Sequence, residues 1–340
     1  MMILGIDTSC DDTSAGVMTD GDRVLSSVVH SQVQVHHPSG GVVPELASRE
    51  HLGKIGTVID QALDKADITR KDLDGIAVTI GPGLIGSLLV GLYFAKAFSY
   101  VLNIPYVGIN HLEGHTLSIF LEDTPPSLPF VVLTVSGGHT ALYHVEGIGH
   151  YTPLGQTLDD AAGEAFDKVA KVLGLGYPGG VVIENLARSG NKDRIRFPRA
   201  YLGSGSLDFS FSGLKTAVAL YVKKWQESGQ SDVSMADIAA SFQEAVIDVL
   251  AEKAIAAAER TQVSSVVVAG GVACNQALRD RVKDLASQCG MTFHYPRPAY
   301  CTDNGAMIAL AGYHRLSRGE RADLSLDVKS RYPVEDIPVL

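Results

Sequence analysis

The chain has 340 residues, of which 46% are hydrophobic and 19% are charged, so it can fill two ordinary lobes with apolar cores. Its net charge of -10 argues against broad, nonspecific affinity for nucleic acid, which depends on accumulated Lys and Arg. Four widely spaced cysteines without a C-x-x-C pair indicate neither a disulfide framework nor a zinc ribbon, and they fit a reducing cytoplasm.

We expect a soluble, cytoplasmic protein that does not enter a membrane. No apolar run is expected to span a bilayer, and the N-terminus opens on a strand pattern rather than on a basic, signal-like region.

The first third of the chain alternates strand and helix patterns. Short strands are expected over 3–7, 14–19 and 24–29, and the first two should form a hairpin around a small polar turn. Apolar periodicity then predicts a helix, a strand, a helix and a strand over 44–65, 74–80, 86–100 and 105–109.

Two histidines four residues apart, His111 and His115, predict a metal site on the next helix. At about 100° per residue the two rings lie only about 40° apart, close enough to bind one divalent ion. The acid between them, Glu113, lies roughly 180° from the midpoint of the rings on a helix, so it cannot be the general base of an H-E-x-x-H zinc protease. The alternative is two unrelated histidines on one helix face.

After a Pro-rich break at 124–127 the opening pattern returns. An apolar segment, 130–135, is followed by a small-residue turn and a second apolar segment, 141–145. This looks like the first hairpin used again, and such a repeat implies two similar lobes with a ligand cleft between them.

Two glycine-containing turns could bind an anion. Small residues let the backbone N–H groups of Ser136, Gly137 and Gly138 approach a phosphate or carboxylate, although an ordinary tight hairpin is the alternative. A buried strand at 265–269 is followed by a glycine turn and a helix start, where the Asn275 side chain is expected to be free to bind a ligand.

A third metal ligand must come from elsewhere in the chain. Asp303 has the right character, because it lies in a turn just before a helical pattern at 307–311, where loop carboxylates commonly reach a site. The alternative for Asp303 is a helix N-cap.

Taken together, a series of motifs resembles the TsaD family, the tRNA threonylcarbamoyladenosine-forming transferases of the actin, hexokinase and heat-shock-70 fold superfamily. The motifs lie at 5–11, 40–49, 111–115, 135–140, 159–168, 177–180, 209–216 and 270–275. The resemblance implies an α/β fold of two similar actin-like (ASKHA) lobes with a ligand cleft between them. The expected lobes are 1–122, completed by a C-terminal helix at 303–326, and 123–302, with a tail at 327–340.

The resemblance also implies the activity: transfer of the threonylcarbamoyl group from threonylcarbamoyl-AMP to N6 of adenosine 37 in tRNAs that read codons beginning with A. An acyltransferase of this kind would use the metal to hold and polarise the acyl group. The alternatives are a metalloprotease, which is an old description of this family as a glycoprotein endopeptidase, and a sugar or acetate kinase on the same fold.

Site residues carry over from the family position by position. The metal ligands match His111, His115 and Asp303, with one divalent ion per chain, iron or zinc (Fe²⁺ or Zn²⁺). The substrate contacts match Val135, Ser136, Gly137, Gly138, His139, Asp167, Gly180 and Asn275, while Glu184 takes a ribose-contacting position where many relatives have Asp.

Four acids have separate assignments. Asp7 and Asp12 stand where many relatives have Glu, so we assign Asp12 no catalytic role. Asp11 could accept the proton that the adenine amine loses, although its alternative is an ordinary turn residue. Asp167 falls in an amphipathic helix pattern, 161–173, where an acid commonly faces solvent, and only the resemblance makes it a ligand contact.

For tRNA, the densest basic stretch is a candidate surface. It contains Lys192, Arg194, Arg196 and Arg199, interleaved with Phe197 and Tyr201. Arginines could bind phosphates there and aromatics could stack, while a solvated loop is the alternative. The resemblance further implies two protein partners, an inactive TsaB-like paralogue of the same fold and a small TsaE-like ATPase.

Overall fold

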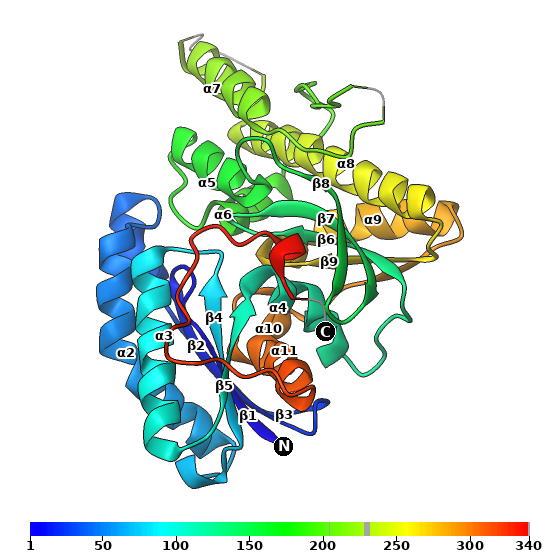
Figure 1. Ribbon diagram of the computed structural model, residues 1–340. Helices are drawn as coiled ribbons and strands as arrows, with labels where there is room; N and C mark the ends of the chain where they lie inside the picture. Colours follow the sequence, from blue (N-terminus) through cyan, green and yellow to red (C-terminus); the bar gives the residue numbers. More distant parts are fainter. Residues whose placement is uncertain (204, 228–231, 339–340) are drawn as a thin grey trace. The chain divides into compact units, whose positions relative to one another are not determined.

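The computed structural model describes residues 1–203, 205–227 and 232–338. The chain divides into two compact units (Figure 1). Unit 1 comprises Met1–Pro126, Gly147–Tyr151 and Pro296–Leu340, and unit 2 comprises Ser127–Glu146 and Thr152–Tyr295.

Unit 1 contains a five-stranded mixed sheet in the order β3-β2-β1-β4-β5. The strands are β1 (Met2–Asp7), β2 (Asp12–Thr19), β3 (Arg23–Ser31), β4 (Gly75–Gly81) and β5 (Tyr106–Asn110). Strands β1, β2 and β3 form an antiparallel meander, whereas β4 and β5 continue the sheet from β1 in parallel. Buried residues occupy the whole of β4, as expected for a strand covered on both faces.

Helices cover both faces of this sheet. They are α1 (Val33–His36), α2 (Pro44–Lys65), α3 (Ile85–Leu102), α4 (His111–Leu117), α10 (Pro298–Cys301) and α11 (Gly305–Ser317). A Cβ on Gly91 of α3 would lie 3.4 Å from Val78, and one on Gly312 of α11 would lie 2.2 Å from the Cβ of Ala77. Because consecutive strand residues point to opposite faces, α3 and α11 pack on opposite sides of β4.

Helix α3 corrects one expectation from the sequence. Its 18 residues are long and apolar enough to cross a membrane by length and composition, although no such run was expected. The helix connects β4 to its parallel neighbour β5, and a crossover of this kind must lie along its own sheet. Helix α3 is therefore a partly buried core helix of a soluble folded protein.

Unit 2 repeats the same strand arrangement. Its sheet has the order β10-β9-β6-β7-β8, with an antiparallel hairpin on one side of β6 and parallel strands on the other. The strands are β6 (Phe130–Val135), β7 (Thr140–Gly147), β8 (His150–Gln156), β9 (Ser265–Ala269) and β10 (Thr292–His294). The repeat expected from the sequence is confirmed, since β6 and β7 correspond to β1 and β2.

The helices of unit 2 bury this sheet. They are α5 (Ala162–Val172), α6 (Gly179–Ala187), α7 (Ser212–Glu227), α8 (Met235–Thr261) and α9 (Gln276–Gln288). Helix α8 is buried along most of its length, and its Ser234 N-cap forms a capping box with Asp237. Such a helix, apolar on most of its circumference, belongs in the interior of a unit.

Candidate metal centre and ligand-binding turn

Helix α4 carries both histidines, and its start is fixed by a side-chain cap. Asn110, the last residue of β5, accepts hydrogen bonds from the backbone N–H groups of Leu112 at 2.8 Å and Glu113 at 3.3 Å. All 7 residues of α4 are buried. The i, i+4 spacing therefore directs both imidazoles into the interior of unit 1 rather than to its surface.

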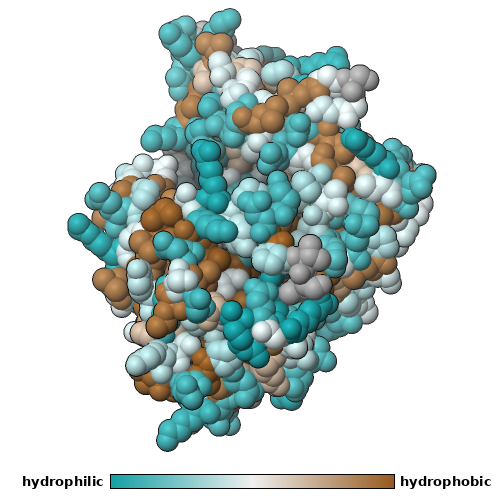
Figure 2. Space-filling model, in the orientation of Figure 1, coloured by the Kyte–Doolittle hydropathy of each residue, from teal (hydrophilic) through white to brown (hydrophobic). Residues whose placement is uncertain are grey.

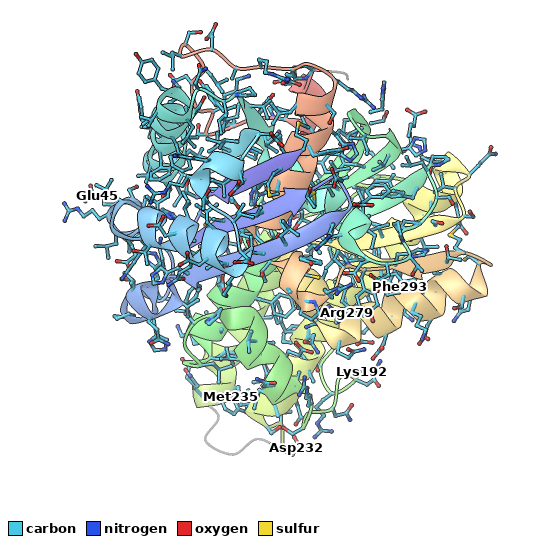
Figure 3. All side chains as sticks on the ribbon, turned by 90° about the horizontal axis from the view of Figure 1, so that it is seen from below. Glu45, Lys192, Asp232, Met235, Arg279 and Phe293 are labelled. Carbon is cyan, nitrogen blue, oxygen red and sulfur yellow. The ribbon has the colours of Figure 1, made fainter. Side chains whose placement is uncertain are left out.

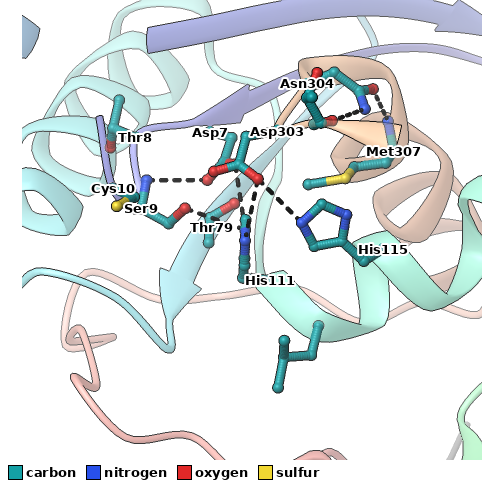
Figure 4. A network of polar contacts seen from close by, with 12 residues as sticks. Asp7, Thr8, Ser9, Cys10, Thr79, His111, His115, Asp303, Asn304 and Met307 are labelled. Carbon is teal, nitrogen blue, oxygen red and sulfur yellow. Dashed lines mark hydrogen bonds and ion pairs between the residues drawn. The ribbon is translucent and has the colours of Figure 1, made fainter. Parts of the chain in front are cut away.

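The two imidazoles converge on one carboxylate (Figure 4). Nε2 of His115 lies 3.0 Å and Nε2 of His111 lies 3.5 Å from Oδ1 of Asp303. One ligand atom from each of the three side chains lies within 4.8 Å of the others. Two imidazole nitrogens and one carboxylate oxygen are a donor set used by zinc and by non-haem iron, so these residues fit such an ion.

A second set of contacts orients the His111 ring. Its Nδ1 lies 3.3 Å from Oδ2 of Asp7 and 3.1 Å from Oγ of Ser9. Holding Nδ1 in this way leaves Nε2 for a metal, which is the usual arrangement of a carboxylate behind a metal-binding histidine. Asp7 therefore orients the His111 ring.

Charge at His111 opposes metal binding at low pH. Burial alone would lower the pKa of His111, but the Asp303 and Asp7 carboxylates outweigh it and raise the pKa to about 9. The ring must therefore release a proton before it can coordinate an ion.

The backbone around Asp303 is held by close packing. Asn304, not Asp303, caps α11, since its Oδ1 accepts the N–H of Met307 at 2.9 Å; the alternative of an N-cap at Asp303 is wrong. A Cβ on Gly5 would lie 2.1 Å from the carbonyl oxygen of Gly305, and one on Gly16 would lie 2.5 Å from the N atom of Ala306. Helix α11 therefore starts in backbone contact with β1 and β2, two residues after Asp303.

Glu113 does not serve the metal group as a base. Its carboxylate accepts hydrogen bonds from Arg315 Nη2 at 2.9 Å and Nε at 3.1 Å, and from Tyr151 Oη at 3.1 Å. The side chain is only 1% exposed. These contacts occupy Glu113, as its place opposite the histidines predicted, and they argue against a zinc-protease mechanism.

Two acids follow β1. The Asp11 side chain is partly exposed. Burial, together with the Asp11 and Asp303 carboxylates, raises the pKa of the neighbouring Cys10 thiol. Burial, then the charge of Asp303, raises the pKa of Asp12 to about 7. Sequence reasoning set Asp12 aside because of its length. No local sequence pattern reveals the partial burial of Asp12 or the nearby Asp303 carboxylate.

In unit 2 the turn between β6 and β7 is tight but open on one side. The N–H of Ser136 donates to the carbonyl of His139 at 2.8 Å, and the N–H of His139 donates to Oγ of Ser136 at 3.2 Å. A Cβ on Gly137 or Gly138 would meet nothing within 4 Å. Space for a ligand is therefore present beside both glycines.

The other side of this turn is closed by two further glycines. A Cβ on Gly163 of α5 would lie 2.6 Å from the carbonyl oxygen of Ser136, and one on Gly270 would lie 2.4 Å from that of Val135. Sequence reasoning did not single out Gly163. The small pair Ala162-Gly163 at the start of α5 was the available signal.

The remaining predicted contacts lie around α6. Oδ1 of Asp167 accepts the N–H of Gly179 at 2.7 Å, so Asp167 is engaged at the start of α6 instead of facing solvent. At the next position, Gly180, a Cβ would have open space. Oε1 of Glu184 accepts the N–H of Gln276 at 3.0 Å and so connects α6 to α9.

The hydrogen bonding of the Asn275 side chain differs from the prediction. We expected a free amide, but its Oδ1 accepts the N–H of Leu278 at 3.0 Å and its Nδ2 donates to Gln243 at 2.8 Å. The amide caps α9, which begins at Gln276, three residues after the expected start at Ala273.

The basic stretch of unit 2 is largely neutralised by nearby acids. Lys192 pairs with Glu244 at 2.7 Å, Arg199 pairs with Asp248 at 2.8 Å, and Arg194 pairs with Asp232 (Lys192 and Asp232 are labelled in Figure 3). Phe197 is buried against Tyr221, and Tyr201 donates its hydroxyl to Glu252. The alternative of a surface loop without a tRNA role fits these contacts better than a phosphate-binding patch.

Comparisons with known proteins agree with the geometry. A family model described as "TsaD: tRNA N6-adenosine threonylcarbamoyltransferase" matches residues 23–310. A protein of that name from Desulforapulum autotrophicum is 55% identical over 332 residues, covering 97% of this chain and 99% of the relative.

Solved structures share the fold at low sequence identity. Component A of (R)-2-hydroxyglutaryl-CoA dehydratase from Acidaminococcus fermentans has a TM-score of 0.54 at 17% identity and covers 92% of this chain and 96% of that one. HypF from T. kodakarensis has a TM-score of 0.62 at 15% identity and covers 93% of this chain and 47% of that one. These matches confirm the predicted α/β class with actin-like sheets.

Proposed function

We propose, because this chain belongs to the TsaD family of tRNA N6-adenosine threonylcarbamoyltransferases, that the two groups of residues described above divide its reaction between them. The reaction forms threonylcarbamoyladenosine (t6A): the threonylcarbamoyl group passes from threonylcarbamoyl-AMP to N6 of adenosine 37 in tRNAs that read codons beginning with A. A bond forms between N6 and the carbamoyl carbon, and the bond from that carbon to the phosphate oxygen of AMP breaks.

The convergence of His111, His115 and Asp303 carries the first part of the proposal. We assign these residues one divalent ion, iron or zinc, on the strength of three ligand atoms within 4.8 Å of one another inside unit 1. When bound, such an ion supplies Lewis-acid polarisation and a template for the acyl group. Asp7 and Ser9 orient His111 from behind.

The turn of unit 2 carries the second part. Backbone N–H groups of Gly137 and Gly138, between Val135 and His139, are assigned to the adenylate phosphate, since the open space beside both glycines supports close approach of an anion. Ser136 holds the turn in shape through its two hydrogen bonds with His139. Asp167, Gly180, Glu184 and Asn275 are assigned to the rest of the nucleotide. The side chains of Asp167, Glu184 and Asn275 are already hydrogen-bonded within the protein, so they can orient the backbone groups that face the nucleotide.

The attacking amine must lose a proton as it acylates. Asp11 is assigned this proton because it is partly exposed on the turn that follows β1.

We further propose a cytoplasmic assembly with tRNA, a TsaB-like paralogue and a TsaE-like ATPase. An apolar groove on α2 and α3 offers the paralogue a surface, and Figure 2 shows hydrophobic residues gathered where these helices lie. Its lining includes Leu52 and Tyr93, which are 71% and 61% exposed. Exposed apolar side chains on two neighbouring helices support a protein contact at this groove.

Mass spectrometry of tRNA nucleosides tests the proposal. The metal-loaded chain, tRNA and threonylcarbamoyl-AMP are incubated with the paralogue, and wild type is compared with Asp303→Asn. We expect t6A from wild type and at most a trace from the variant. Equal t6A from both would remove the metal group from the reaction, and chelator-sensitive peptide cleavage without t6A would favour the protease alternative.

A further inference from the structure

We infer that Glu113 is a positioning residue for the metal ligands, acting through its buried ion pair with Arg315. The pair connects α4, which supplies His111 and His115, to α11, which begins two residues after Asp303. The inference rests on the proposed metal site and adds to it the device that sets the relative position of its ligands.

The proposed ligands lie far apart in the sequence, so contacts within the fold must hold them together. His115 and Asp303 are 188 residues apart in sequence, so covalent connection does not fix the distance between them. Helix α4 has only 7 residues and cannot be held by a long packed face. Ligand constellations function when held within about 0.5 Å of their productive geometry, so a small slide of α4 along α11 would separate the three donors.

Two contacts between α4 and α11 oppose such a slide. A Cβ on Gly114 would lie 2.8 Å from Cδ1 of Ile308 and 3.2 Å from Cγ of Met307, so the helices are in close contact there. Next to it, Glu113 receives two hydrogen bonds from the planar guanidinium of Arg315. A bidentate pair constrains direction as well as distance, whereas apolar packing alone tolerates sliding.

The surroundings of the pair show that it is a closed network. Arg315 and Glu113 are 2% and 1% exposed. The Nη1 atom of Arg315 also donates to Glu320 at 2.8 Å, and Tyr151 donates to Glu113. Buried ion pairs contribute little net stability compared with apolar packing, so a role in fixing geometry is the better account of this one.

Cobalt binding separates this role from general stability. Purified metal-free wild type, Glu113→Gln and Glu113→Asp are titrated with Co²⁺, whose visible absorption reports ligand geometry. The control is Val58→Ala, which removes a buried side chain from α2 and leaves α4 and α11 intact. Thermal unfolding of each variant is measured in parallel.

We expect Glu113→Gln to weaken Co²⁺ binding by about tenfold or more and to alter the spectrum, because supporting residues behind metal ligands have effects of this size. Glu113→Asp, which keeps the charge, should recover part of the loss. Val58→Ala should lower the unfolding temperature without changing Co²⁺ affinity. Should Glu113→Gln fold poorly, Tyr151→Phe removes a single hydrogen bond to Glu113 and should weaken binding to a smaller extent.

Three results would overturn the inference. Unchanged affinity and spectrum in folded Glu113→Gln and Tyr151→Phe would contradict it while leaving the metal site in place. An equal loss of affinity in Val58→Ala would assign the effect to stability. Absence of Co²⁺, Zn²⁺ and Fe²⁺ binding by wild type would remove the proposed metal site and this inference with it.

Discussion

The hairpin turns of the two units occupy equivalent places in equivalent sheets, yet they are packed differently. In unit 1 the turn after β1 is enclosed: Thr8 Oγ1 donates to the carbonyl of Ser87 at 2.8 Å, and the carbonyl of Ser9 accepts the N–H of Leu84 at 2.8 Å. In unit 2 the turn after β6 leaves Gly137 and Gly138 with nothing within 4 Å of a Cβ.

Under the proposed function, one topology serves two kinds of chemistry. Beside the enclosed turn, Asp7 and Ser9 contact Nδ1 of His111, a proposed metal ligand. The open turn offers backbone N–H groups to whatever approaches. Side-chain chemistry needs fixed rotamers and burial, whereas backbone recognition of an anion needs small residues and space.

The largest effect should come from removing a donor in unit 1. Asp303→Asn keeps volume and leaves the Asn304 cap intact, but it replaces the carboxylate that faces both histidines. We expect loss of bound metal and a fall in t6A yield of roughly 100-fold or more, since even residues behind ligands cost 10- to 100-fold. Asp22→Asn, an exposed acid of the same unit, is the control.

This substitution is preferable to truncating a histidine. His115 is fully buried, so its replacement by Ala would open a cavity in unit 1. Full metal occupancy in Asp303→Asn, measured by elemental analysis, would show that the three side chains do not form the site.

A substitution in the open turn of unit 2 should lower the affinity for the adenylate rather than the free energy of unfolding. Gly137→Val places a branched side chain where the anion must approach, although nothing in the folded chain opposes it. Loss of hydrogen bonds to a charged group predicts about 10- to 100-fold weaker binding of a nonhydrolysable adenylate analogue by calorimetry.

Gly213→Val, at another glycine with open space, is the control for Gly137→Val. Equal affinity in both variants would reduce the Ser136–His139 segment to an ordinary hairpin turn.

A substitution that crowds the enclosed turn of unit 1 should instead lower the free energy of unfolding. A Cβ in Gly83→Ala would lie 2.5 Å from the carbonyl oxygen of Ser9, which is backbone and cannot move away easily. We expect a loss of roughly 1–3 kcal/mol in the free energy of unfolding, as for other overpacked sites. Denaturant titration measures it, and an unaltered midpoint would contradict the comparison of the two turns.

The smallest change should be in tRNA binding when the arginines of the basic stretch are replaced. Because Arg194 and Arg199 are already paired with Asp232 and Asp248, the triple variant of Arg194, Arg196 and Arg199 to Ala should change the logarithmic salt slope of tRNA binding by less than about 1. A change of two units or more would show that tRNA displaces these acids.

Local patterns in the sequence predicted the elements well where periodicity is strong. The helix expected at 44–65 is α2, and the strands expected at 130–135 and 265–269 are β6 and β9. Spacing alone placed His111 and His115 on one face, because that geometry is internal to a helix.

Contacts between distant segments could not be predicted from the sequence. Arg315 is 202 residues from Glu113, and no local signal joins them. The engagement of Asn275 by Gln243 and the neutralisation of the basic stretch also depend on partners that only the fold brings together.

Anomalous diffraction from crystals of the metal-loaded chain, collected across the zinc and iron absorption edges, locates the bound ion directly. We expect one strong peak bounded by Nε2 of His111, Nε2 of His115 and the carboxylate of Asp303. A fully occupied peak held by other side chains, or none at these three in a protein that forms t6A, would contradict it.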